Sequence, residues 1–227
     1  MPAELAGAGA GAGATAGAGA PHGLVIGESD VFDQAEYDAY RLLGGPSVAL
    51  HGGAALFSGP RVEVLEGSRP WRRLVGLVFE SMGAARTWHD SPEHQQAREQ
   101  RLRGARSSVW LIEQTGDPAP IAPGSGAAPL AYMLGEVTAI HDTEHFKEYL
   151  RSVAPSLATV GGRYLTKGGR IDLVEGPWQP ARAVLIEFPS WDVAAAWYRS
   201  DAYQPLARLR QGCADTELVL LEGVMRA

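Results

Sequence analysis

The chain contains one long segment twice, and this repeat limits the possible folds more than any other feature of the sequence. A shift of 109 residues aligns residues 33–113 with residues 142–222 without a gap, and 24 of these 81 pairs are identical. The clearest stretch is GGRYLTKGGRIDLVEG at residues 161–176, whose earlier copy reads GGAALFSGPRVEVLEG at residues 52–67. A period of this length indicates a duplicated domain rather than a solenoid of short repeats.

Both copies have the same predicted order of elements, which is easiest to see in the second. Strands are predicted over residues 131–140, 163–176, 181–188 and 216–223, where residues 163–176 form one bent strand or two short ones around Gly168. Helices are predicted over residues 141–162, with Asp142 as N-cap and Pro155 as a kink or break, and over residues 190–211, with a break near Ser200. The order β-α-β-β-α-β is the ferredoxin-like pattern.

A ferredoxin-like unit covers only one face of its sheet with helices, so the other face must pack against something else. Two units on one chain can cover each other. We therefore predict an α+β protein with two tandem ferredoxin-like (βαββαβ) domains packed as an intramolecular pseudo-dimeric α+β barrel. The predicted boundaries are a flexible Gly/Ala arm at 1–23, a diverged domain at 24–114, a linker at 115–129 and a second domain at 130–227.

Composition narrows the class of partner. The net charge is −6 and no basic stripe occurs, which argues against nucleic acid. No run of 18 apolar residues is present, so we expect no membrane span. The single cysteine, Cys213, fits a reducing compartment, and the N-terminus lacks signal-peptide features, so we expect a cytoplasmic protein. We expect a monomer that is itself a pseudo-dimer, and leave further dimerisation open.

The second copy resembles a small, largely uncharacterised family in the dimeric α+β barrel superfamily. The motifs are GGRYL, LVEGPW, RAVLIEFPS, AAAWYRSDAYQ and LARLR, within residues 132–223, and the first copy retains VLEG, LVFES and TWHDSPEHQ. The resemblance implies paired sheets with a cavity between sheet and helices. The superfamily contains cofactor-free oxygenases, cyclases, isomerases and decarboxylating enzymes, as well as members without known activity, and the fold alone does not choose among them.

Two carboxylates are candidates for acid/base chemistry. Along residues 183–188 the side chains alternate, which places Glu187 on the face away from the helices. The neighbouring strand carries Glu136, and two carboxylates lying close together would raise the pKa of at least one. The alternative is that Glu187 pairs with Arg163 or Arg182 and holds the sheets in register.

Arg163 and Tyr164 differ most sharply between the copies, because Ala54 and Ala55 replace them in the first. The arginine can clamp a carboxylate or phenolate, and the tyrosine can donate a proton to an oxyanion. The alternative is a salt bridge between sheets and an aromatic plug. The alanines either enlarge one cavity for a ligand or mark a lost site, and we favour one enlarged pocket.

His89 and His94 replace Tyr198 and Tyr203 of the second copy. Histidine titrates near neutral pH, so either residue can act as a base. Asp90 follows His89 directly, and adjacent residues do not share a helical face, so Asp90 is expected to be a poor partner for His89. The alternative is a pair of solvated histidines at a helix end.

The remaining histidines are expected to have structural roles. His51 is expected to interact with the C-terminal dipole of the preceding helix, although it can also reach the pocket. His141 and His145 belong to an HxxEH pattern, which straddles the predicted start of a helix and is not repeated in the first copy. We therefore predict no metal and no cofactor.

The function that we infer from the sequence is an enzyme that uses acid/base chemistry on an aromatic or polyketide-like small molecule without a cofactor. The reaction would be a cyclisation, isomerisation, dehydration or cofactor-free oxidation, and its expected setting is natural-product biosynthesis. The predicted catalytic residues are Glu187, His89, His94 and Tyr164. The predicted substrate-binding residues are Arg163, Arg182, Trp197, Tyr198, Tyr203, Trp88, Glu136 and His51. The alternative is a non-catalytic pseudo-dimer that binds a small molecule.

Overall fold

A computed structural model describes residues 21–58, 61–117, 129–178 and 180–225. Residues 1–20 of the predicted arm and residues 118–128 of the predicted linker lie outside the described residues. None of the helices in the described ranges is long and apolar enough to cross a membrane.

The two halves contain the same elements in the same order. The N-terminal half consists of β1 (Gly23–Val31), α1 (Gln34–Leu50), β2 (Ala54–Phe57), β3 (Val62–Glu66), β4 (Arg73–Phe79), α2 (Met82–Asp90), α3 (Pro92–Gly104) and β5 (Ala105–Glu113). The C-terminal half consists of β6 (Ala131–Ile140), α4 (Thr143–Ala158), β7 (Arg163–Lys167), β8 (Ile171–Glu175), β9 (Arg182–Phe188), α5 (Trp191–Arg199), α6 (Gln204–Cys213) and β10 (Ala214–Glu222).

Local signals in the sequence set the ends of these helices. Asp142 caps α4, and its carboxylate accepts hydrogen bonds from the backbone N–H groups of Glu144 and His145, as predicted. The predicted break near Ser200 is confirmed, since Ser200 ends α5 before α6 begins. Pro155 does not split α4, which continues through it to Ala158.

Each half gives one strand to the sheet of the other half. One five-stranded sheet has the order β2-β4-β1-β5-β8, and the other has the order β3-β10-β6-β9-β7. The sequence predicted two ferredoxin-like units with a sheet each, and it left open whether residues 163–176 form one strand or two. They form two strands in different sheets, because β7 pairs with β9 whereas β8 crosses to β5. The two tandem units are therefore present, but neither sheet is complete without the other half.

Glycines make the crossing possible. Gly168, between β7 and β8, has φ +93°, in the left-handed region that favours glycine. Gly176 directly follows β8 with φ +77°, and a Cβ atom there would lie 2.3 Å from the carbonyl oxygen of Ser107. Gly176 therefore lets β8, the strand that crosses to the sheet of the other half, end close against β5.

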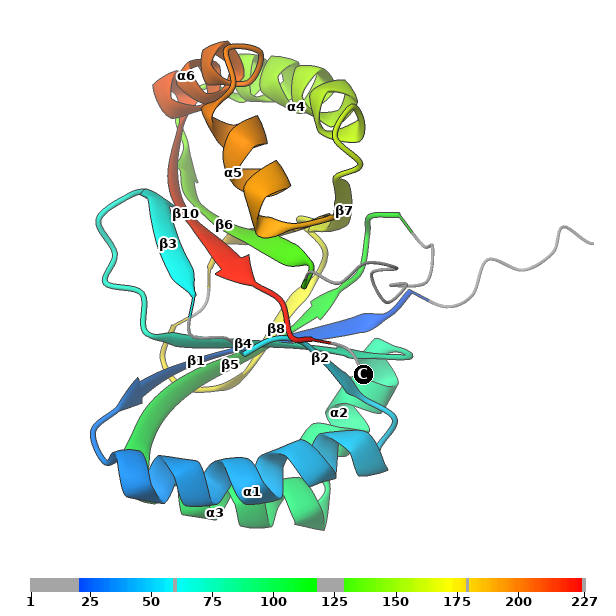
Figure 1. Ribbon diagram of the computed structural model, residues 1–227, viewed down its shortest axis with the longest axis vertical. Coiled ribbons are helices and arrows are strands. Elements are labelled where there is room, and N and C mark those ends of the chain that lie inside the picture. Colours follow the sequence, from blue (N-terminus) through cyan, green and yellow to red (C-terminus); the bar gives the residue numbers. More distant parts are fainter. Residues whose placement is uncertain (1–20, 59–60, 118–128, 179, 226–227) are drawn as a thin grey trace, which may run out of the picture.

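The two sheets face each other and the helices cover the outer sides. Figure 1 shows α4, α5 and α6 at the top and α1, α2 and α3 at the bottom, with the strands between them. The central core combines buried side chains of both sheets, including Leu24, Trp110, Leu134 and Leu185. This packing confirms the predicted intramolecular pseudo-dimer, because each sheet covers the bare face of the other.

The alternation along β9 also follows the prediction. Ile186 and Phe188 pack with the helices of the C-terminal half, whereas Ala183 and Leu185 lie in the core between the sheets. A space between helices and sheet is thus available in each half, on the outer side of its sheet.

Candidate functional site

The exchanged strand β8 brings a carboxylate from the C-terminal half to the helices of the N-terminal half. Glu175, the last residue of β8, lies opposite Val109 of β5. Both of its oxygens accept hydrogen bonds from Nη2 of Arg101 in α3, at 2.7 and 2.6 Å, and Nε of Arg98 lies 3.1 Å from Oε1. Because Arg101 and Glu175 are both buried, this ion pair is shielded from water. Glu66 of the N-terminal half pairs in the same way with Arg210 of the C-terminal half, so each half depends on a side chain from the other.

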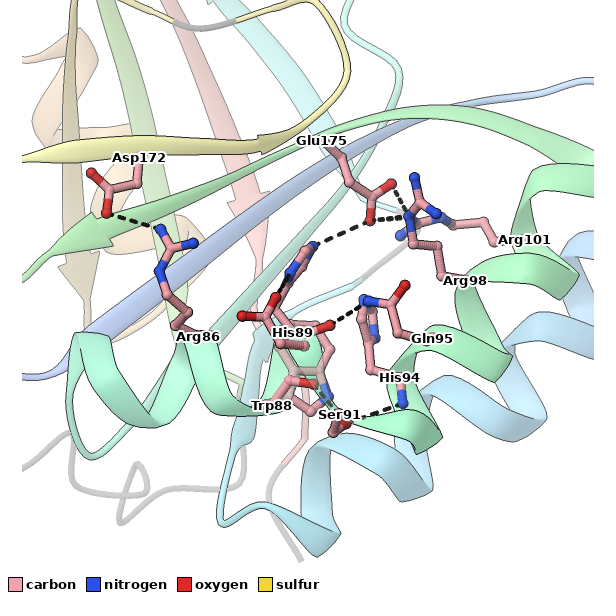
Figure 2. A network of polar contacts seen from close by, with 11 residues as sticks. Arg86, Trp88, His89, Ser91, His94, Gln95, Arg98, Arg101, Asp172 and Glu175 are labelled. Carbon is pink, nitrogen blue, oxygen red and sulfur yellow. Dashed lines mark hydrogen bonds and ion pairs between the residues drawn. The ribbon is translucent and has the colours of Figure 1, made fainter.

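Two buried histidines lie beside this ion pair (Figure 2). His89, near the end of α2, has Nε2 3.6 Å from Glu175 Oε1 and Nδ1 2.9 Å from Asp90 Oδ1. The expectation that Asp90 is a poor partner was wrong: because α2 ends at Asp90, its side chain can fold back onto the neighbouring ring. His94, in α3, is 1 % exposed, and neither ring nitrogen has a hydrogen-bond partner among the described residues.

The two histidines have pKa values shifted in opposite directions. The nearby carboxylate of Glu175 is the main cause that raises the pKa of His89, against the opposing effect of burial. Burial, together with the positive charges of Arg101 and His89, lowers the pKa of His94 to about 4. Burial alone would raise the pKa of Glu175, but the neighbouring His89 and the charge of Arg101 outweigh it and bring this pKa to about 2. At neutral pH the site therefore holds a neutral His94 beside an ionised Glu175.

His94 lines a cavity between the helices and the sheet of the N-terminal half. Two adjoining spaces of about 230 and 30 Å³, here called its larger and smaller lobes, share the walls Tyr37, Tyr40, Val75, Leu77 and Trp88. His94 and Arg101 line the smaller lobe, and Arg41 and Arg73 line the larger. The walls are mainly aromatic and apolar, with a few polar groups, as is usual for a small-molecule site.

In the C-terminal half, the described cavity whose walls are mainly equivalent to those of the smaller lobe measures about 50 Å³. Tyr164 and Tyr203 line it, where the N-terminal half has Ala55 and His94. Among the cavities described between helices and sheet, the largest, of about 230 Å³, lies in the copy with alanines, which agrees with the predicted enlargement of one pocket. Burial raises the pKa of Tyr164 well above its usual value, so this hydroxyl stays protonated.

Arg163 and Glu187 form a salt bridge rather than part of either cavity. Arg163 Nε donates to Glu187 Oε1 at 2.8 Å, and the hydroxyl of Tyr132 donates to Glu187 Oε2 at 3.3 Å. Glu187 is 6 % exposed and pairs across the sheet with Tyr132, whereas Glu136 pairs with Ala183. The expected closeness of Glu136 to Glu187 was wrong, because four residues of strand separate them. The contact matches the alternative prediction for Glu187, in which it pairs with Arg163.

Glu136 instead meets its repeat equivalent, Glu28, between the two sheets. Arg69 lies between them, donates from Nη1 to both oxygens of Glu136 at 3.1 Å and also donates to Glu28. Trp178 donates from Nε1 to Glu136 Oε2 at 3.3 Å and also lies against the guanidinium of Arg69. Two carboxylates thus share one arginine at the junction of the halves.

The other predicted binding residues lie at different places. Trp88 lines both lobes and donates from Nε1 to Ser47 Oγ at 3.2 Å, while its equivalent Trp197 donates to Ser156 Oγ at 3.1 Å. Tyr203 is buried beside the small C-terminal cavity.

Three further residues do not line the enlarged cavity. Tyr198 donates to Glu66 Oε1 at 2.8 Å, and Arg182 donates to the carbonyl oxygen of Lys167 at 2.8 Å. His51 is the C-cap of α1, as expected, and its Nε2 lies 3.4 Å from Glu93.

Sequence reasoning missed Glu175, Arg101 and Tyr40. All three were identifiable as identities within the repeat, since they align with Glu66, Arg210 and Tyr149. What the sequence did not indicate is that Glu175 belongs with helices of the other half.

The same residues also form a donor set for a cation. A ligand atom from each of His89, His94 and Glu175 lies within 4.8 Å of the others, and imidazole and carboxylate suit divalent transition metals. However, Arg98 and Arg101 already pair with this carboxylate, so a divalent cation would be placed among positive charges. The charge balance favours an ion-paired acid/base site, and the absence of a metal stays a prediction. The HxxEH pattern forms no such set in the described residues, because His145 pairs with the cap residue Asp142 and His141 with Asp215.

Structures with this fold are known from other organisms. A proposed monooxygenase from Lactobacillus acidophilus is 13 % identical, with 91 % of this chain and 100 % of that chain covered and a TM-score of 0.51. A proposed monooxygenase from Fusobacterium nucleatum is 10 % identical, with 89 % and 92 % covered and a TM-score of 0.54. An anthrone oxidase-like protein is 12 % identical, with 89 % and 91 % covered and a TM-score of 0.51. These similarities concern the fold alone.

No curated protein matches the sequence. The sequence profile of one protein family, described as a domain of unknown function (DUF1330), matches residues 22–115 and again residues 130–224. These two matches cover most of the chain and correspond to its two halves. The chain therefore belongs to the DUF1330 family, as two tandem copies of its domain.

Proposed function

We propose that the protein is a small-molecule enzyme that uses acid/base chemistry without a cofactor, with its active site in the enlarged cavity of the N-terminal half. The observation that carries this proposal is His94. Its ring is buried, faces the cavity, and has two nitrogens without hydrogen-bond partners in the described part of the chain. A buried imidazole without partners costs free energy, which a bound substrate can recover by hydrogen bonding to it.

His94 would act as the general base. Its low pKa keeps the ring neutral at physiological pH, so that a nitrogen can accept a proton. A base with a pKa of about 4 is weak, and the substrate proton must therefore be acidic, as on a phenol or on a carbon between two carbonyl groups. Such a proton fits a proton-transfer reaction of a phenolic or polyketide-like compound.

The surrounding residues would have supporting roles. Burial raises the pKa of Tyr40, which lines both lobes, so its hydroxyl remains a donor for a developing oxyanion. His89 does not line the cavity, but its ring centroid lies 5.3 Å from that of His94. Its charge helps to keep His94 neutral, so His89 is a positioning residue. Glu187 and Tyr164, predicted from the sequence as catalytic, lie outside this cavity and have no part in the proposal.

The reaction classes to test first are isomerisation, cyclisation, dehydration and cofactor-free oxidation. Oxidation enters the list because the similar structures include two proposed monooxygenases and an anthrone oxidase-like protein. The cavity volume of about 230 Å³ favours small substrates within each class.

The experiment is a comparison of His94→Gln with His51→Gln, which lies outside the cavity, in a screen of phenols and 1,3-dicarbonyl compounds followed by mass spectrometry. We expect the unmodified protein to convert a subset of compounds, His94→Gln to lose at least about 100-fold in rate, and His51→Gln to retain the rate. Binding should persist in His94→Gln.

A second pair of variants tests the location of the site. Ala55→Tyr introduces the side chain that fills the other cavity, whereas the exposed neighbour Ala54→Tyr leaves the cavity open. We expect only Ala55→Tyr to abolish binding and turnover. If compounds bind but are recovered unchanged from both the unmodified protein and His94→Gln, the protein is a non-catalytic binding protein instead.

A further inference from the structure

The internal repeat provides a built-in comparison for the enlarged cavity. At two wall positions the N-terminal half has a smaller residue: Gly44 for the buried Val153, and Ala55 for Tyr164. At a third position it has a charge, since Arg41 replaces Leu150. The half that has gained space has therefore also gained a cation beside it.

One cation of the larger lobe, Arg73, is not balanced by a carboxylate in the described part of the chain. Arg41 and Arg73 line this lobe, and no carboxylate lines either lobe in the described residues. Arg73 is half-buried at the start of β4, with its guanidinium 5.2 Å above the ring of Tyr37, and no described carboxylate lies within salt-bridge distance of it. Arg41 pairs with the exposed Asp38, at 3.4 Å. The charge of Arg101, in contrast, is already taken by Glu175.

The size of the cavity limits the ligand to about one ring. An apolar cavity of about 150 Å³ holds a benzene molecule, and the two lobes here measure about 230 and 30 Å³. Tyr37, Tyr40 and Trp88 provide aromatic surfaces on which a ring can pack. One ring with one or two polar substituents fits this space, whereas a fused polyketide does not.

We propose that the ligand of this cavity is a monocyclic aromatic carboxylate. Its carboxylate binds Arg73, with Arg41 adding positive charge, its ring packs between Tyr40 and Trp88, and its opposite end points to His94 in the smaller lobe. A guanidinium matches a carboxylate in geometry and charge. This inference rests on the proposed function and names the substrate class for the same site.

The test uses matched probes that differ only in charge. We would measure binding of 4-hydroxybenzoate, 4-hydroxyphenylacetate and the corresponding neutral amides by calorimetry and ligand-observed NMR. The carboxylates are expected to bind at least about tenfold more tightly than the amides, since a hydrogen bond to a charged group contributes about 1.5–3 kcal/mol. Equal binding of amide and carboxylate would overturn the substrate class and leave the acid/base cavity standing.

Variants of the two equivalent arginines locate the charge. Arg73→Met should abolish the preference for the carboxylate and leave amide binding unchanged, whereas Arg182→Met, at the equivalent position of the other half, should change neither. Arg73→Lys keeps the charge and should keep the preference, which separates charge from any effect on folding.

The remaining outcomes separate the two proposals. Binding of both probes that persists in Ala55→Tyr would refute the location of the site, and with it both proposals. If no carboxylate binds, the substrate class is wrong, and the acid/base cavity is then judged by the His94→Gln comparison alone.

Discussion

Glu136 is expected to make the folded protein less stable as the pH rises from 4.5 through 7. Its side chain is fully buried where the two sheets meet, beside Arg69, Glu28 and Glu217. The pKa of Glu136 is raised from 4.5 to about 7, and burial is the largest cause. The charges of Glu28 and Glu217 add to this shift, whereas the attraction of Arg69 and the hydrogen bond from Trp178 oppose it.

The sign follows from proton counting. Between pH 4.5 and 7 the unfolded chain has lost the Glu136 proton and the folded chain has kept it, so the folded state is favoured less as the pH rises. Each pH unit of this interval is worth about 1.36 kcal/mol, which gives about 3 kcal/mol in total. This stabilisation is fully present below pH 4.5 and is lost as the pH rises through 7.

The perturbation is Glu136→Gln, which keeps the shape and removes the titration. Urea unfolding of both proteins from pH 4.5 to 8 should show the free energy of unfolding of the unmodified protein falling by about 3 kcal/mol relative to the variant. Glu80→Gln, which changes an exposed carboxylate, should give a curve parallel to that of the unmodified protein. A difference between Glu136→Gln and the unmodified protein that stays constant with pH would refute the reasoning.

Three further predictions concern the site and the strand exchange. Arg101→Met should destabilise the fold by about 3–5 kcal/mol in denaturant titrations, because it leaves Glu175 buried without its main partner, and adding Glu175→Gln should restore part of that loss. Once a substrate is found, the rate should fall as the pH drops through about 4, where His94 takes up a proton, and an acidic limb near 6.5 would argue against His94 as the base. Gly176→Ala should destabilise the fold by more than about 1 kcal/mol, because the position has a positive φ and the added Cβ would lie 2.3 Å from a backbone oxygen. Gly212→Ala, at a helical position with open space, should instead stabilise the fold by up to about 1 kcal/mol, and both effects are measured as shifts in Tm.

The sequence carried much of the fold because local signals and the repeat agree. Asp142 caps α4 through its own neighbouring N–H groups, and the alternation along β9 gives each side chain its face. Both depend on contacts between residues close in the chain. The repeat also predicted that the two sheets pack face to face, since each copy leaves one face of its sheet without helices.

The candidate site was only partly predictable. Two replacements were visible in the aligned copies: Ala55 for Tyr164, which favoured one enlarged pocket, and His94 for Tyr203, which suggested a base. The predicted pairing of Glu136 with Glu187 was wrong because the strand register, which the sequence did not specify, places them four residues apart.

By itself, the sequence determined that the chain is a tandem duplication with a βαββαβ order in each copy, because hydrophobic periodicity, caps and glycine positions are local properties. Only the tertiary structure decided that β3 and β8 change sheets, because backbone hydrogen bonds at a sheet edge do not depend on which side chains the strand carries. That exchange places Glu175 beside Arg101 and His89, 74 and 86 residues away in the chain. Burial, aided by the charges of Arg101 and His89, keeps His94 neutral, whereas the charge of Glu175 opposes this effect.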